Sequence, residues 1–171
     1  MNQTLENILT RRSTRKFLNK PIPEEEMELL VQAALHAPSG RGLQTWQFTV
    51  VRKRENIDRL AAAIAKELNR EGYDMYRPQA LIIPSNLKES PFGKEDDACA
   101  LENIFLAAHS LGIGSVWINQ LQNICDAPEI RSVLDSFGIP ADHVVYGLAA
   151  LGYPDDEKAP KKRTGKVVYA D

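Results

Sequence analysis

The residues best suited to chemistry form a short run near the start of the chain, Arg11-Arg12-Ser13-Thr14-Arg15. Arginine presents a planar fork of N–H donors that fits both phosphate oxygens and the edge of a planar heterocycle. Three such forks and two hydroxyls within five residues could bind a phosphate-bearing ligand. A run of charges can equally be a solvated turn after a short helix, so the run by itself leaves both interpretations open.

Three other stretches place polar or aromatic groups where a ligand could reach them. The run 38–42, Pro-Ser-Gly-Arg-Gly, is a flexible connection whose glycines would let the backbone approach a flat ligand, or would only permit a tight turn. Trp117, Ile118 and Asn119 end a short apolar run, at a sheet edge where open sheets bind ligands, although such a tryptophan is often core. Lys161 and Arg163 could bind phosphate or belong to a solvated tail.

The histidines and cysteines indicate no metal site and no catalytic triad. His36, His109 and His143 are scattered and lack an obvious serine or cysteine nucleophile as a partner. Cys99 and Cys125 lie far apart and match no metal-ligand spacing. We interpret both cysteines as reduced and buried, which favours a cytosolic compartment.

Composition limits the classes of function. The chain has 171 residues, with 21 Lys and Arg against 23 Asp and Glu, a formal net charge of −2 and a pI near 6.0. This balance argues against a nucleic-acid-binding protein, and the length predicts a single domain over residues 1–171. No secretory signal and no apolar stretch long enough to span a bilayer are found, so we expect a soluble, cytoplasmic protein.

Hydrophobic periodicity predicts the elements that position these residues. We expect a helix capped by Thr4 that leads into the arginine run, a helix from Pro23 that Pro38 stops, and a strand over 46–51. Further elements are a helix over 57–68, a strand over 80–83, a mobile loop around Gly93, a well buried helix from about 96 to 111, a strand over 113–118, a helix over 128–137 and one long strand over 143–151. The total is four or five strands and five helices.

The residues after Pro154 change character. They are polar and charged up to Arg163, and strand character returns only at Val167-Val168-Tyr169. Such a tail cannot fold by itself, but a short terminal strand can add to the edge of a sheet, either its own or that of a partner.

Taken together, the motifs resemble the nitroreductase family of flavoproteins. The matching stretches are the arginine run at 11–15, Ala37-Pro38-Ser39 followed by Gln44 and Trp46-Gln47-Phe48, Asn103 to Ala108 before Gly112 to Ile118, and Gly152-Tyr153-Pro154 with its basic tail. Each stretch is weak alone, but their order and spacing match the family across nearly the whole chain.

The resemblance implies an α+β fold of three layers, in which helices flank a central, mostly antiparallel sheet. It also implies an intertwined homodimer with two FMN sites at its interface. The C-terminal arm, about residues 155–171, would embrace the partner subunit, and the strand 167–169 would extend the partner's sheet.

The resemblance also implies residue roles. Arg11 and Ser13 would bind the FMN phosphate and ribityl chain with Arg12 close by, Arg15 would reach the pyrimidine edge of the ring, and Lys161 and Arg163 would close on the phosphate. Pro38, Ser39 and Gly40 would come from the other subunit. Trp117, Ile118 and Asn119 would lie near the middle of the ring, where backbone N–H groups can bond to N5 or O4.

Some positions depart from the family pattern. Gly42 and Thr45 stand where the family often has asparagine and proline, and Asn119 replaces a small or acidic residue. The chain also lacks the long helical insertions that cover the substrate side in larger members, so we expect a more open pocket.

The activity that the resemblance implies is two-electron transfer from NADH or NADPH to a nitroaromatic or quinone by a ping-pong mechanism. We name no catalytic residue, since the hydride chemistry belongs to the flavin. The alternatives are a flavin-binding sensor or store without turnover, another reaction of the same fold such as dehalogenation, flavin fragmentation or dehydrogenation, and a phosphate-binding domain without flavin.

Overall fold

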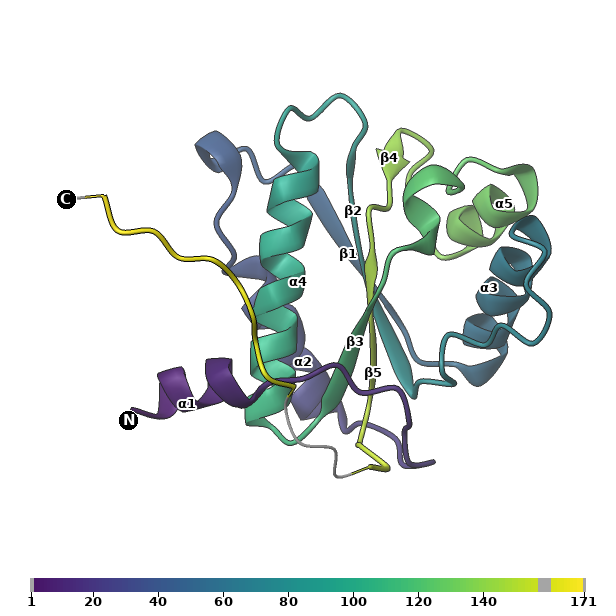
Figure 1. Ribbon diagram of the computed structural model, residues 1–171. Helices are drawn as coiled ribbons and strands as arrows, with labels where there is room; N and C mark the ends of the chain where they lie inside the picture. The colour runs from purple at the N-terminus through teal and green to yellow at the C-terminus, as the bar shows by residue number, and fades with distance from the viewer. Residues whose placement is uncertain (1, 157–160, 171) are drawn as a thin grey trace.

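The computed structural model describes residues 2–156 and 161–170. In chain order, the elements are α1 (Gln3–Thr10), α2 (Glu24–Leu35), η1 (Gly40–Gly42), β1 (Trp46–Val51), α3 (Arg54–Glu67), β2 (Ala80–Leu87), α4 (Gly93–Ser110), β3 (Gly114–Ile118), η2 (Gln120–Asn123), α5 (Pro128–Ser136), β4 (His143–Val144) and β5 (Leu148–Gly152). Figure 1 shows one sheet with helices on both of its faces. Within the described part of the chain, no helix is long and apolar enough to cross a membrane.

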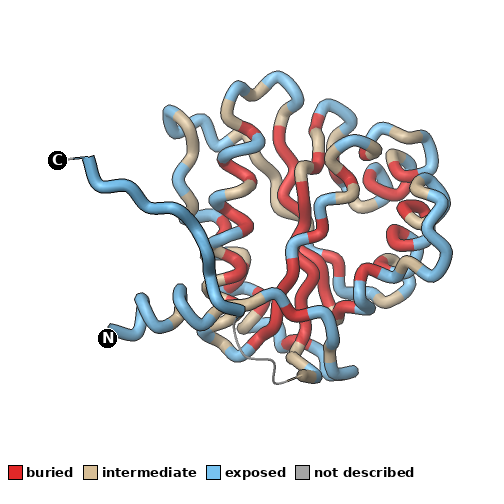
Figure 2. Tube along the Cα trace, viewed as in Figure 1, coloured by how far each residue is buried: buried red, intermediate tan, exposed pale blue. Residues whose placement is uncertain are grey.

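The sheet is antiparallel and has the strand order β1-β2-β5-β3, with β4 paired to β2. Successive side chains of β2 point to opposite faces of the sheet, so they pack in two separate hydrophobic cores. Leu81 and Ile83 pack in the cluster under α3 and α5, while Ala80 and Ile82 pack in the cluster under α2 and α4. The buried residues in Figure 2 accordingly follow the sheet and the inner faces of the helices. The three-layer architecture is thus established.

The helix α4 carries the most buried side chains, as predicted. Leu101, Ile104, Phe105 and Ala108 follow the i, i+3, i+4, i+7 spacing and are at most 4% exposed. Fully burying a leucine, isoleucine or phenylalanine side chain contributes about 1.5–3 kcal/mol each, so this face fixes α4 firmly on the sheet. Residues that contact either end of α4 therefore have well-defined positions.

Two predictions at helix starts were wrong. The cap of α1 is Asn2, whose Oδ1 accepts from the N–H of Leu5 at 2.9 Å, rather than Thr4, which already lies in the helix. Gly93 begins α4 instead of lying in a mobile loop, because it packs on the side chain of Asn86, which a Cβ at residue 93 would meet at 3.1 Å.

The predicted strand over 143–151 is two strands, β4 and β5. The break falls at Gly147, where a Cβ would lie 2.3 Å from Nε1 of Trp117, so the indole occupies the space of a side chain there. The prediction for the cysteines was half right: Cys125 is buried, but Cys99 is exposed on α4.

The two outer edges of the sheet differ. The N-terminal segment lies along β3, where the N–H of Thr14 donates to the carbonyl of Ser115 at 2.8 Å, and Phe17 pairs with Pro154 just after β5. Among the described residues, no strand pairs with the outer side of β1. The outer side of β1 therefore offers an open edge for a further strand.

The C-terminal residues 161–170 leave the lower end of α4 in Figure 1 and extend away from the body. They have no regular secondary structure, and Val167, Val168 and Tyr169 are 73%, 70% and 86% exposed. Residues 157–160 of the predicted arm lie outside the described residues. The pairing of 167–169 with a partner's sheet stays a prediction, since it needs a second copy of the chain.

Candidate functional site

The segment Ser13–Phe17 is tied to the sheet by isolated bridges, Ser13 to Ser115 and Phe17 to Pro154, and burial separates the residues of the arginine run. Thr14 is 2% exposed and packs on Gly114, where a Cβ would lie 2.7 Å from the side chain of Thr14. Its neighbours Ser13 and Arg15 are exposed. Ser13 and Arg15 therefore lie on the surface on either side of the buried Thr14, while Arg11 and Arg12 are both half-buried.

The three arginines have different partners. Arg12 Nη2 lies 2.5 Å from the carboxylate of Asp156 and donates to its carbonyl at 2.7 Å. Arg11 lies 3.6 Å from the carboxylate of Glu102 and 6.0 Å from the centroid of Phe105. Arg15 has no carboxylate partner in the part of the chain that is described, and its guanidinium stands over the ring of Tyr76, 5.8 Å from the centroid. Arg12 thus ties the segment to the end of β5, while the N–H groups of Arg15 are uncommitted.

An aromatic wall stands next to Arg11. The rings of Phe105 and Trp117 lie 6.0 Å apart in a tilted arrangement, and Trp117 is 39% exposed. Ile118 is buried at 3%, so only its backbone could meet a ligand, and Asn119 is exposed just after β3. Trp117 is therefore partly core and partly surface, a position that the sequence left open.

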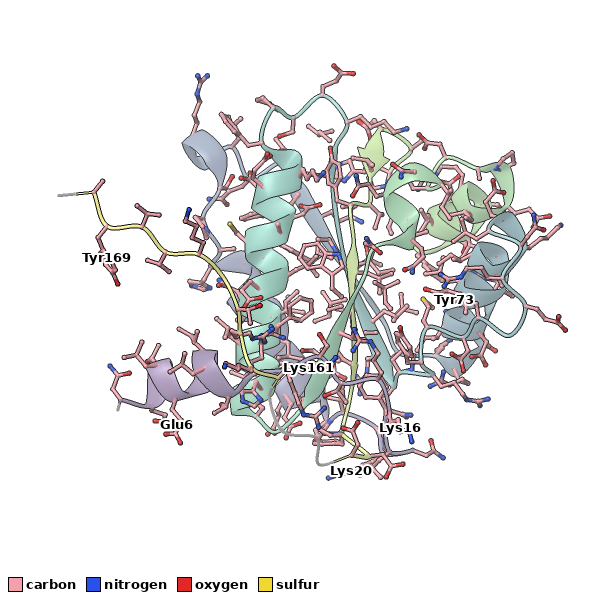
Figure 3. All side chains as sticks on the ribbon, viewed as in Figure 1. Glu6, Lys16, Lys20, Tyr73, Lys161 and Tyr169 are labelled. Atoms are coloured by element: carbon pink, nitrogen blue, oxygen red, sulfur yellow. The ribbon has the colours of Figure 1, made fainter. Side chains whose placement is uncertain are left out.

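The basic tail returns to the same end of the molecule. Arg163 Nη2 donates to the carbonyl of Arg11 over 3.5 Å, a long and weak bond. Figure 3 shows Lys161 over the lower part of α4, where the N-terminal segment passes. Arg11, Lys161 and Arg163 thus bring several cations to one end of α4, where the carboxylate of Glu102 lies beside Arg11. Such an excess of donors fits a phosphate group.

The loop that contains Pro38, Ser39 and Gly40 is held at the opposite end of α4. Ser39 Oγ donates to Asp96 Oδ2 at 2.8 Å, and the N–H of Gly40 donates to Asp96 Oδ1 at 2.8 Å. Gly40 also lies against the ring of Phe92, which a Cβ at residue 40 would meet at 2.3 Å. Glycine is required there by this close approach.

A second carboxyl lies beneath this loop. Asp97 is fully buried, and its Oδ1 accepts from Asn86 Nδ2 at 2.9 Å, while Asn86 Oδ1 accepts from Thr45 Oγ1 at 2.6 Å. No described residue bonds to Asp97 Oδ2. Burial raises the pKa of Asp97 to about 7, the bond from Asn86 opposes this shift, and the charge of Asp96 adds to it.

The two groups of predicted site residues are far apart in one chain. Asp96 holds the loop near the start of α4, whereas the N-terminal segment meets the other end, where Thr10 Oγ1 lies 2.9 Å from His109 Nε2. At 1.5 Å per residue, Asp96 and His109 are separated by roughly 20 Å along the helix. The structure brings Arg11, Lys161 and Arg163 to one end of α4 and leaves Pro38, Ser39 and Gly40 at the other.

Sequence reasoning missed three residues at these two places. Phe105 was assigned only to the core, Asp96 only to a helix start, and Tyr76 received no role. Helical periodicity correctly placed Phe105 on the buried face, but no local signal shows that its ring also meets Arg11. No pattern links Asp96 to Ser39 or Tyr76 to Arg15, because these contacts join separate parts of the chain.

Comparison with known proteins gives a consistent result. The model of the nitroreductase family matches residues 8–153. A protein of Archaeoglobus fulgidus named for NADH dehydrogenase or NAD(P)H nitroreductase activity is 35% identical, over 92% of this chain and 89% of its own. The NADPH-flavin oxidoreductase of Vibrio harveyi is 31% identical, over 95% of this chain and 70% of its own.

A solved structure agrees over the whole chain. The crystal structure of a nitroreductase with bound FMN from Bacteroides fragilis is 40% identical, covers 100% of both chains and has a TM-score of 0.89. The predicted fold class, α+β with three layers and a mostly antiparallel central sheet, is confirmed by this likeness and by the strand pairing.

Proposed function

The chain belongs to the nitroreductase family, and we propose on this basis that it is an FMN-dependent oxidoreductase that passes two electrons from NADH or NADPH to a small acceptor such as a nitroaromatic or quinone. The observation that carries the proposal is the end-to-end likeness to an FMN-bound nitroreductase, combined with the cationic end of the molecule. The relatives named for NAD(P)H nitroreductase and NADPH-flavin oxidoreductase activity support the choice of electron donor.

The residues at the cationic end fit FMN. Arg11, Ser13, Lys161 and Arg163 would hold the phosphate and ribityl chain, and Arg15 would face the pyrimidine edge with its uncommitted N–H groups. When bound, FMN supplies the two-electron chemistry, so no protein side chain needs to act as a nucleophile. Arg12, which is paired with Asp156, would position the segment rather than touch the phosphate.

The second half of the site would come from a partner subunit. Ser39 and Gly40 are held at the end of α4 away from Arg11, so one chain does not bring both groups onto one cofactor. A two-fold homodimer would place the loop 38–40 of one subunit against the segment 11–15 of the other, in both sites at once.

The C-terminal arm has a fitting place on the partner. A groove of about 630 Å³ runs between α2 and β1, and its lining includes Glu24, Glu25, Glu28, Leu29 and Val50. The arm 161–169 is basic first and apolar last, which complements these carboxylates and apolar side chains. We therefore place the strand 167–169 at the open edge of the partner's β1.

The proposed function is tested by its cofactor and by its half-reactions. The purified protein, incubated with FMN and passed through a desalting column, should retain the flavin absorption band. Anaerobic addition of NADH or NADPH should bleach that band, and an acceptor should restore it. Initial rates with both substrates varied should give the parallel double-reciprocal lines of a ping-pong mechanism.

Other outcomes would separate the alternatives. A protein that holds FMN without bleaching would be a flavin-binding sensor or store, and a protein that does not retain FMN would contradict the proposed function. Bleaching without transfer to nitroaromatics or quinones would point to another reaction of this fold.

A further inference from the structure

The turn before β2 has an unusual backbone. Met75, Tyr76 and Arg77 have φ angles of +52°, +68° and +51°, so three consecutive residues other than glycine are left-handed. For such residues this conformation brings Cβ too close to the following carbonyl oxygen, which costs free energy at each position. Runs of strained residues persist only where the surrounding structure fixes them, and they are concentrated at functional sites.

The turn is fixed on both sides. Asp74, which precedes the turn, makes two hydrogen bonds to it. Its Oδ1 accepts from the N–H of Tyr76 at 2.9 Å, and its carbonyl accepts from the N–H of Arg77 at 2.9 Å. Met75 is fully buried in the core that α3 covers, and Gln79 bonds to the carbonyl of Leu151 at 2.8 Å. The turn thus buries Met75 and presents the neighbouring ring of Tyr76, which is 42% exposed.

The exposed ring of Tyr76 lies against Arg15. The guanidinium carbon of Arg15 lies 5.8 Å from the centroid of the ring, within the range of a cation–π contact. Stacking on a ring face leaves the in-plane N–H donors of a guanidinium available. Arg11 and Arg12 both have carboxylate partners, so the ring replaces an ion pair that would consume the donors and neutralise the charge.

We propose that Tyr76 is a positioning residue for the flavin ring, and that the left-handed turn 75–77 serves to hold its side chain beneath Arg15. The inference rests on the proposed function and adds to it a residue that determines where the ring-side cation stands. A cation fixed at the pyrimidine edge favours the negative charge of the reduced cofactor, so Tyr76 contributes to the reduction potential without touching the flavin.

The test compares Tyr76→Leu, which removes the ring face and keeps apolar bulk, with Tyr76→Phe, which keeps the ring. Exposed cation–π contacts are weak, so we expect the leucine variant to hold the reduced flavin about threefold less tightly relative to the oxidised form. For a two-electron couple this is a midpoint potential lower by about 14 mV. The phenylalanine variant should keep the wild-type potential.

Two further variants show whether the effect passes through Arg15. In an Arg15→Ala background, Tyr76→Leu should no longer change the potential, because a positioning residue has nothing left to position. Arg70→Ala is the matched control. It removes another cation–π contact near the turn, in which the guanidinium carbon of Arg70 lies 5.5 Å from the ring centroid of Tyr73, and it does not involve Arg15. This control should leave the potential unchanged.

A measurement without flavin keeps this inference separate from the proposed function. In the flavin-free protein, the side-chain N–H signals of Arg15 should carry the upfield shift of a proton above a ring, retained in Tyr76→Phe and lost in Tyr76→Leu. An unshifted signal in the wild type, or an equal loss of potential with and without Arg15, would overturn the role of Tyr76. Failure to bind FMN would instead overturn the proposed function and leave the signal to decide the contact.

Discussion

In the proposed function the cationic segment 11–15 and the loop 38–40 bind one ligand, yet they are built in opposite ways. In the segment, the backbone is held by the sheet edge and the functional side chains point outward; Thr14 bonds to Ser115 while Arg15 stays exposed. In the loop, the side chain of Ser39 points inward to Asp96. The segment offers side-chain charge, whereas the loop offers backbone and shape.

The difference teaches how the site must be assembled. In the cationic segment, Arg11 and Arg12 lie beside carboxylates, whereas Arg15 lies on an aromatic ring. The loop is shaped by two acids at the start of α4, one of them fully buried. Since these regions lie at opposite ends of α4, the proposed site combines the segment of one subunit with the loop of the other.

The largest expected effect tests that assembly directly. A subunit with Arg11→Ala and Arg15→Ala should lose its cationic half-site, and a subunit with Asp96→Ala should lose its loop. Each homodimer should be nearly inactive, but mixed dimers keep one intact site. After unfolding and refolding together in equal amounts, about a quarter of the wild-type sites should return.

The experiment compares the rate of NAD(P)H oxidation by the refolded mixture with the sum of the rates of the two variants refolded separately. Activity no greater than that sum would mean that both half-sites act within one chain. Wild-type protein refolded in the same way shows what fraction of the activity survives the refolding procedure.

The second expected effect is on stability and concerns the loop alone. Asp97 has its pKa raised from the ordinary 3.8 to about 7 by burial, so between these pH values the folded state binds a proton that the unfolded state has lost. The free energy of unfolding should therefore fall as pH rises from about 4 to 7, by at most about 4 kcal/mol. Below this window no stability is lost, and above it the loss is complete.

Asp97→Asn should flatten this dependence, because the amide keeps an acceptor for Asn86 and does not titrate. Urea unfolding at several pH values measures the slope. Asp58→Asn, which removes an exposed carboxylate 3.4 Å from Arg54, is the matched control and should retain the wild-type slope. An equal slope in wild type and Asp97→Asn would contradict the prediction.

The smallest expected effect sharpens the division within the cationic segment. Arg15→Ala should lower the reduction potential of bound FMN, by about 30 mV for each tenfold loss of preference for the reduced form. Arg11→Ala should weaken FMN binding in a salt-dependent manner and change the potential less, since Arg11 is proposed to bind the phosphate rather than the ring. Equal potentials in the two variants would remove the ring-side role of Arg15. Titration of the apoprotein with FMN measures the affinity, and reduction in the presence of a reference dye measures the midpoint potential.

The sequence by itself determined much of this protein. Periodicity located the helices and most strands, because 3.6-residue and two-residue repeats are local properties, and the spacing of several weak motifs identified the family. Local patterns failed where a side chain distant in sequence packs on a glycine: the indole of Trp117 lies against Gly147, just before β5, and the side chain of Asn86 lies against Gly93.

Only the tertiary structure decided which of the chemically similar residues are available. The sequence shows three arginines, but the fold pairs Arg12 with Asp156, places Glu102 beside Arg11 and sets Arg15 on Tyr76. It also holds Ser39 to Asp96, 57 positions away, far from those arginines. The physical reason is that charge and hydrogen-bonding capacity belong to the residue, whereas the partner that uses this capacity is chosen by packing between elements remote in the chain.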